Sequence, residues 1–207
     1  MNFHPYYLQQ MGIELWEKRR PSVLTALKAL EDSVSQCTDC QSPSLSPNAK
    51  AVFGRGNAKA TLVIIGDAPD EQESAAGLPF VGKQQSLLEK MLISIGLVKT
   101  DVYMTHVLKY QPEEHAGIDD LKIATRHAQQ HLEQQIALIS PKVLLALGPL
   151  AAQLLCNSSS SIDGLRGACH SYQALPCIVS YPLNQLLTHG HYKKEAYQDL
   201  LLVKSRL

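Results

Sequence analysis

Residues 60–82 read ATLVIIGDAPDEQESAAGLPFVG, a short apolar run that leads into a glycine and an acidic loop. The run at 60–66 is apolar throughout and rich in β-branched residues, which is typical of a strand buried on both faces of a parallel sheet. Ligands in such folds bind at the carboxyl ends of the strands, where the loop that begins at Asp67 would lie. The stretch therefore predicts a central strand with a site beside it.

The rest of the chain repeats this alternation of strand and helix. Further apolar, β-rich runs occupy residues 101–108, 142–148 and 177–182. Segments with apolar residues at helical spacing occupy residues 83–96, 119–140, 148–156 and 193–207. Strands that alternate with helices imply a parallel sheet with helices on both faces. We therefore predict an α/β fold with three layers, αβα, around a central parallel sheet.

Composition and charge narrow the range of functions. The chain has 207 residues, of which 45% are hydrophobic, enough for one ordinary domain and a short appendage. Its 19 basic residues balance 19 acidic ones, so only a local basic patch could attract nucleic acid. No apolar run approaches the roughly 20 residues that span a bilayer, and the N-terminus has no signal-peptide pattern. We expect a cytoplasmic protein that does not enter a membrane.

A proline divides the chain into an N-terminal peptide, 1–20, and an α/β domain, 21–207, that begins with a predicted helix. In the peptide, Leu8 and Met11 fall at helical spacing, and Trp16 is the only tryptophan in the chain. Two interpretations stay open. The peptide folds back on its own domain as a terminal helix, or it is a short linear anchor that becomes ordered on a partner.

From about Cys37 to its C-terminus the chain resembles the iron-sulfur uracil-DNA glycosylases, family 4 of the uracil-DNA glycosylase superfamily. In order, the motifs that carry the resemblance are CTDC (37–40), VFGRGN (52–57), LVIIGDAP (62–69), GLPFVGKQQSLLEKML (77–92), IGLVKTDVYMTHVLK (95–109), PKVLLALG (141–148), LRG (165–167) and KKEAYQDL (193–200). Their order and spacing imply a uracil-DNA glycosylase-like fold.

Carried over residue by residue, this resemblance places four side chains at the glycosylase site. Asp67 matches the acidic residue that assists the water or the glycosyl cation, and Phe80 matches the ring that stacks on flipped-out uracil. His106 replaces an asparagine that reads the uracil edge, and Tyr181 replaces a histidine that donates to uracil O2. An imidazole cannot offer an acceptor and a donor side by side, and losing one donor typically slows such reactions about a hundred- to a thousand-fold. We therefore interpret the site as degenerate and expect none of its residues to be catalytic.

The resemblance also implies an iron-sulfur cluster held by four cysteines. Cys37 and Cys40 keep the first pair, but Tyr110 and Thr125 stand at the third and fourth positions. We therefore expect no cluster and no metal. Two histidines are candidates for substitute ligands, His127 and His131. A lone CxxC could also be redox-active, but no thioredoxin-like pattern surrounds this one.

The N-terminal peptide resembles a second family. Residues 6–21, YYLQQMGIELWEKRRP, resemble the start of the psi subunit of bacterial DNA polymerase III. Apolar side chains in this stretch would fill pockets of a partner, and its two arginines would pair with carboxylates at the rim. The expected partner-binding residues are Leu8, Gln9, Gln10, Met11, Gly12, Ile13, Trp16, Arg19 and Arg20.

In that second family the peptide binds the clamp loader, and the folded domain binds the chi subunit, which holds single-stranded DNA-binding protein. The two resemblances together predict a non-catalytic psi-type subunit that bridges the clamp loader and chi in a replisome at the nucleoid. Direct contact with DNA stays open. The alternative is a base-excision DNA glycosylase with an altered active site, which acts on a flipped base through Asp67, Phe80, His106 and Tyr181.

Overall fold

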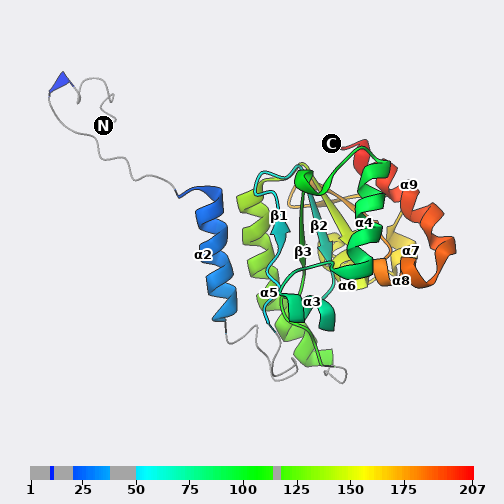
Figure 1. Cartoon of the computed structure of the whole chain (residues 1–207), viewed down its shortest axis with the longest axis horizontal. Helices are drawn as coiled ribbons and strands as arrows, with labels where there is room; N and C mark the ends of the chain where they lie inside the picture. The colour runs from blue at the N-terminus through cyan, green and yellow to red at the C-terminus, as the bar shows by residue number, and fades with distance from the viewer. Residues whose placement is uncertain (1–9, 12–20, 38–49, 114–117) are drawn as a thin grey trace.

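Figure 1 shows a computed structural model of the chain, which describes residues 10–11, 21–37, 50–113 and 118–207. Within these residues the centre of the molecule is one sheet of six strands in the order β1-β3-β2-β4-β6-β5. The strands are β1 (Arg55–Gly56), β2 (Leu62–Gly66), β3 (Val102–His106), β4 (Val143–Leu147), β5 (Cys169–Tyr172) and β6 (Leu175–Ser180). The four inner strands, β3, β2, β4 and β6, run parallel, while β1 and β5 pair antiparallel at the two edges.

Helices cover both faces of the sheet, as Figure 1 shows for α2 and α5 on one side and α4 and α9 on the other. The helices are α2 (Val23–Ser35), α3 (Glu71–Ala76), α4 (Gly82–Ser94), α5 (Ile118–Ile139), α6 (Pro149–Cys156), α7 (Ile162–Leu165), α8 (Leu183–Thr188) and α9 (Lys193–Lys204), with short 3-10 turns η1 (Lys99–Asp101) and η2 (Gly190–Tyr192). The predicted three-layer α/β fold is confirmed.

The central strands have this form because their side chains are apolar on both faces. Every residue of β2, β3 and β4 is buried. Alternate residues of β2 point to opposite layers, since Val63 and Ile65 pack with α2 and α5 whereas Leu62 and Ile64 pack with α4 and α9. Burial on both sides fixes the register of the strand, because a slip by one residue would exchange the two faces.

The edge strands were not predicted from the sequence. Strand β1 has only two residues, which is too short for a pattern to show. Strands β5 and β6 form a hairpin whose turn residues, Gln173 and Ala174, both have positive φ, 48° and 68°. Asn and Gly are the usual residues in such turns, so Gln-Ala gives no sequence signal.

The N-terminal peptide, 1–20, lies outside the described residues except for Gln10 and Met11. The domain itself opens with α2, whose first turn is capped by Ser22, since its hydroxyl accepts the N–H of Thr25 at 3.2 Å. Division of the chain at residue 20 stays a prediction. Among the described residues, no helix is both long and apolar enough to cross a membrane.

Candidate active site

Three of the four predicted site residues lie at the carboxyl ends of parallel strands. Asp67 follows β2, His106 is the last residue of β3, and Tyr181 follows β6. The fourth, Phe80, belongs to the loop between α3 and α4. Tyr181 lies two strands away from β2, because β4 is inserted between β2 and β6.

The carboxylate of Asp67 is held by the first turn of α6. Its Oδ1 accepts the backbone N–H of Ala151 at 2.8 Å. Gly148 makes this approach possible, because its φ is +125° and a Cβ there would collide with the Asp67 carboxylate. Burial raises the pKa of Asp67 to about 6, although the N–H groups of Ala151 and Leu150 favour the ionised form. Asp67 is therefore a carboxylate that titrates close to neutral pH.

Glu73 organises the loop beside Asp67 and was not singled out from the sequence. Its side chain is fully enclosed, and it accepts the N–H of Asp70 at 2.8 Å while Asp70 accepts the N–H of Glu73 at 2.8 Å. This reciprocal pair is a capping box at the start of α3. An Asp followed three residues later by Glu is the sequence signal that could have revealed it.

The same carboxylate holds His106 and Phe80. Glu73 Oε1 lies 3.1 Å from Nε2 of His106 and also accepts the backbone N–H of Phe80. Burial by itself raises the pKa of Glu73, but the hydrogen bond and charge of His106, together with the N–H groups of Asp70 and Phe80, lower it overall. The ionised carboxylate is an acceptor, so Nε2 of His106 is the donor.

His106 and Phe80 stack beside the end of β2. Their ring centroids lie 4.7 Å apart with the planes tilted by 51°, and both side chains are buried. Gly66 pairs with His106 in the sheet, and a Cβ on Gly66 would collide with the imidazole. Nδ1 of His106 is buried and has no hydrogen-bond partner among the described residues. His106 therefore lies tilted against Phe80, and one of its ring nitrogens has no hydrogen-bond partner among the described residues.

Phe80 sits in a constrained backbone conformation. Its φ is +53°, in the left-handed region that non-glycine residues seldom adopt. Glu73 accepts its N–H, and Nη2 of Arg55 donates to its carbonyl oxygen at 2.6 Å. Two charged side chains thus fix both backbone polar groups of the residue whose ring is the predicted stacking surface.

The hydroxyl of Tyr181 is hydrogen-bonded to two carboxylates. Its hydroxyl lies 2.7 Å from Asp163 Oδ1 and 2.7 Å from Glu195 Oε2, so the single phenol proton serves carboxylates from α7 and α9. Arg166 lies over the Tyr181 ring at 5.1 Å and pairs with the buried Asp199 at 3.2 Å. Burial, followed by these two acceptors, raises the pKa of Tyr181 far above its usual value. The structure therefore uses the phenol to join β6 to two helices.

Most of the chain matches a known protein superfamily. A model of the uracil DNA glycosylase superfamily matches residues 53–201, which include all four site residues. This chain belongs to that superfamily. The resemblance to uracil-DNA glycosylases is therefore confirmed at the level of the superfamily.

Individual relatives carry the name type-4 uracil-DNA glycosylase. The one from Archaeoglobus fulgidus is 37% identical over 132 residues, covering 63% of this chain and 65% of the relative. The one from Pyrobaculum aerophilum is 28% identical over 181 residues, covering 82% and 90%. The one from Thermotoga maritima is 32% identical over 143 residues, covering 68% and 72%. The aligned region thus spans just under two thirds of the Archaeoglobus protein.

These findings correct the interpretation of the chain as a psi-type polymerase subunit. The chain matches the uracil DNA glycosylase superfamily, and the relatives described above are named as glycosylases. The prediction of a non-catalytic subunit that binds the clamp loader and chi is therefore wrong. Of the residues expected to bind a partner, Gln10 and Met11 are described, and Met11 is exposed. The others lie outside the described residues: Leu8, Gln9, Gly12, Ile13, Trp16, Arg19 and Arg20. A short peptide that resembles one family cannot outweigh a match across the folded domain.

The residues at the family's cluster positions do not fit four-cysteine ligation. Cys37 packs against the buried ring of Tyr110, whose hydroxyl donates to the carbonyl of Val34 at 3.2 Å. Cys40 lies outside the described residues. The other three cysteines lie on or beside the strands at the opposite edge of the sheet: Cys156, Cys169 and Cys177. Across the described ranges, no group of three or more His, Cys, Asp or Glu side chains could hold a metal ion.

Proposed function

We propose that this chain is a DNA glycosylase that excises a uracil-class base flipped out of DNA, with Asp67 as its reacting carboxylate. The observation that carries the proposal is the Asp67 carboxylate at the end of β2, hydrogen-bonded to the start of α6 and shifted to a pKa of about 6. It stands in a domain of the uracil-DNA glycosylase superfamily. Such an enzyme would work where the cell keeps its DNA.

The reaction needs one carboxylate and one water. The bond between C1′ of the deoxyribose and the base nitrogen breaks, and its electron pair leaves with the base. Water oxygen then bonds to C1′, and Asp67 takes the proton that this water releases. An ionised Asp67 also stabilises, by electrostatic attraction, the positive charge that develops on the sugar. A pKa of about 6 leaves the carboxylate ionised at neutral pH yet basic enough to accept a proton.

The base would be held by Phe80 and read by His106. Phe80 is fixed through its backbone by Glu73 and Arg55, so its ring is set before a base arrives. His106 has committed Nε2 to Glu73, and its other nitrogen, Nδ1, is buried beside Gly66, so a base could bind it only if the ring moved. With Nε2 donating to Glu73, the imidazole offers a base at most one further hydrogen bond, where an amide would both accept and donate. We therefore expect slow excision of uracil and weak discrimination between related bases.

Release of the base is the direct test. Purified full-length protein in excess over single-stranded or duplex oligonucleotides with one deoxyuridine should produce abasic sites. Asp67→Asn should slow this release at least about a hundredfold, because the amide neither carries the charge nor accepts the proton. The rate should fall roughly tenfold per pH unit below about pH 6, where Asp67 becomes protonated, and level off above it.

Glu71→Gln is the matched control, because Glu71 is an exposed carboxylate on the neighbouring α3. Its rate should stay within twofold of the unaltered chain. Failure to release uracil, hypoxanthine or xanthine under these conditions would overturn the proposal. An Asp67→Asn variant as fast as the unaltered chain would show that Asp67 is not the reacting carboxylate.

A further inference from the structure

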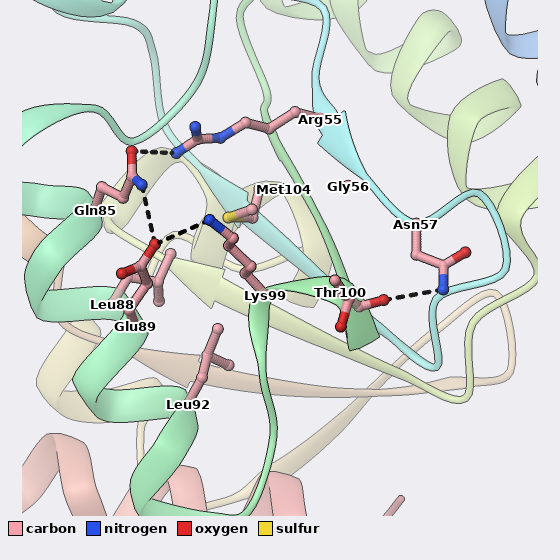
Figure 2. A pocket seen from close by; sticks show the side chains of 10 residues that line it. All are labelled: Arg55, Gly56, Asn57, Gln85, Leu88, Glu89, Leu92, Lys99, Thr100 and Met104. Atoms are coloured by element: carbon pink, nitrogen blue, oxygen red, sulfur yellow. Dashed lines mark hydrogen bonds and ion pairs between the residues drawn. The ribbon is translucent and has the colours of Figure 1, made fainter.

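A pocket of about 480 Å³ opens between α4 and the edge of the sheet formed by β1 and β3. It lies on the α4 face near the start of β3, since Thr100 in η1 lines it, whereas Asp67 and His106 stand at the carboxyl ends of their strands. Figure 2 shows its lining residues, which come from β1, α4, η1 and β3, together with Asn57 just after β1. Its volume falls within the range of roughly 300–1,000 Å³ that small-molecule sites occupy.

The floor of the pocket is apolar. Leu88 and Leu92 of α4 face Met104 of β3, and all three side chains are at least 94% buried. Arg55 and Gly56 of the two-residue strand β1 bound the pocket along the sheet edge. The methionine sulfur makes favourable contacts with aromatic rings, which suits a ligand with a planar ring.

The rim is polar and carries an excess of positive charge. Figure 2 shows a chain of contacts in which Arg55 donates to Gln85 at 3.2 Å, Gln85 donates to Glu89 at 2.9 Å, and Lys99 lies 4.0 Å from Glu89. Two cations therefore face one carboxylate. At 4.0 Å, and with a Lys99 side chain that is 65% exposed, the last pair is weak, so the ammonium can turn to a ligand anion.

Arg55 supplies an unused donor. Its Nε is buried and has no hydrogen-bond partner among the described residues, while Nη2 already serves Phe80 and Gln85. Burial lowers the pKa of this guanidinium, opposed by Glu89 and Glu73, and the group stays charged because of its high intrinsic basicity. A buried donor without a partner is costly, which favours a ligand that brings an acceptor.

We propose that this pocket binds a nucleotide, with its planar ring on the floor of Leu88, Leu92 and Met104 and its phosphate between Arg55 and Lys99. This second site does not depend on base excision at Asp67. The same chemistry is offered by a free nucleoside monophosphate and by a nucleotide within a DNA strand. Because Arg55 also holds the Phe80 carbonyl, a ligand here touches a residue that positions the predicted stacking ring.

The test follows the methyl resonance of Met104 in full-length protein labelled with ¹³C-methyl methionine, assigned with Met104→Leu. Thymidine monophosphate should shift this resonance in a saturable way, thymidine should bind more weakly, and inorganic phosphate should leave the resonance in place. Met91, on α4 but outside the pocket, should not move. The same titration is repeated with a uracil-free oligothymidylate. If the oligonucleotide shifts the Met104 resonance in a saturable way and the mononucleotide does not, the ligand of this site is a DNA strand.

Charge reversal at the rim separates this site from general attraction to anions. Lys99→Glu should raise the dissociation constant about tenfold. Lys90→Glu makes the same change at an exposed position of α4 that does not line the pocket, and should alter it by less than twofold. Absence of a saturable Met104 shift with both the mononucleotide and the oligonucleotide would overturn the proposal. Equal weakening by the two charge reversals would overturn it as well.

Discussion

His106 and Tyr181 are the two site residues predicted to depart from the glycosylase pattern, and the structure gives them different partners. His106 lies within the site, where it binds Glu73, stacks on Phe80 and keeps Nδ1 unpartnered among the described residues. The hydroxyl of Tyr181 contacts Asp163 and Glu195. His106 therefore belongs to the cluster of Glu73 and Phe80, whereas Tyr181 joins β6 to two helices.

The contrast shows why a substituted motif does not by itself mean a lost reaction. A buried polar group must have partners, and the choice of partner decides whether it stays available to a ligand. Glu73 satisfies one nitrogen of His106, and the other is buried beside Gly66 without a partner among the described residues. Two carboxylates satisfy Tyr181 through its only proton. Three experiments test whether the two residues differ in this way.

The largest effect is expected from Glu73→Ala. This change removes the acceptor of the Asp70 and Phe80 N–H groups and of His106, all in a buried setting. We expect a loss of about 3 kcal/mol in the free energy of unfolding, measured by urea denaturation. Glu71→Ala on the exposed side of α3 should cost less than about 0.5 kcal/mol. A loss of less than about 1 kcal/mol in the free energy of unfolding for Glu73→Ala would show that this carboxylate does not hold His106 and Phe80 in place.

A smaller effect is expected from His106→Asn. An amide offers a donor and an acceptor side by side, so single-turnover release of uracil should become about tenfold faster. His131→Asn, at a partly buried position of α5, is the matched control and should leave the rate unchanged. A rate that stays equal or falls would mean that His106 does not face the base.

The smallest effect is expected from Tyr181→Phe. Loss of one hydroxyl shared by two carboxylates should cost about 1 kcal/mol in the free energy of unfolding and leave base release nearly unchanged. Tyr197→Phe, whose side chain is 45% exposed on α9, should change neither quantity. Loss of base release without loss of stability would place the phenol at the reacting atoms and end the contrast with His106.

Local patterns were enough to predict the central strands and most of the covering helices. β2 and β4 are short apolar runs, β3 is apolar up to Thr105 and His106, and their neighbours have apolar residues at helical spacing. The outer strands were missed because their information is not local. Two-residue β1 is defined by its pairing with Met104 and Tyr103, and β5 by a hairpin turn without Asn or Gly.

The candidate site was predicted as a set of four positions, and the partners that give those positions their chemistry were not. Glu73 and Arg55 were not singled out as site residues, yet they fix both backbone polar groups of Phe80. The peptide resemblance also misdirected the functional interpretation, because it covered about a tenth of the chain while the superfamily match covers residues 53–201.

Sequence alone was enough to predict the layered α/β architecture and the place of Asp67 after the first central strand. These follow from hydrophobic period and motif order, which neighbouring residues carry along the chain. The hydrogen-bond partners of two other site residues became visible in the folded structure: Glu73 binds His106, and the carboxylates of Asp163 and Glu195 bind Tyr181. Hydrogen bonds between residues 14 to 33 positions apart depend on how strands and helices pack, and no local pattern encodes that geometry.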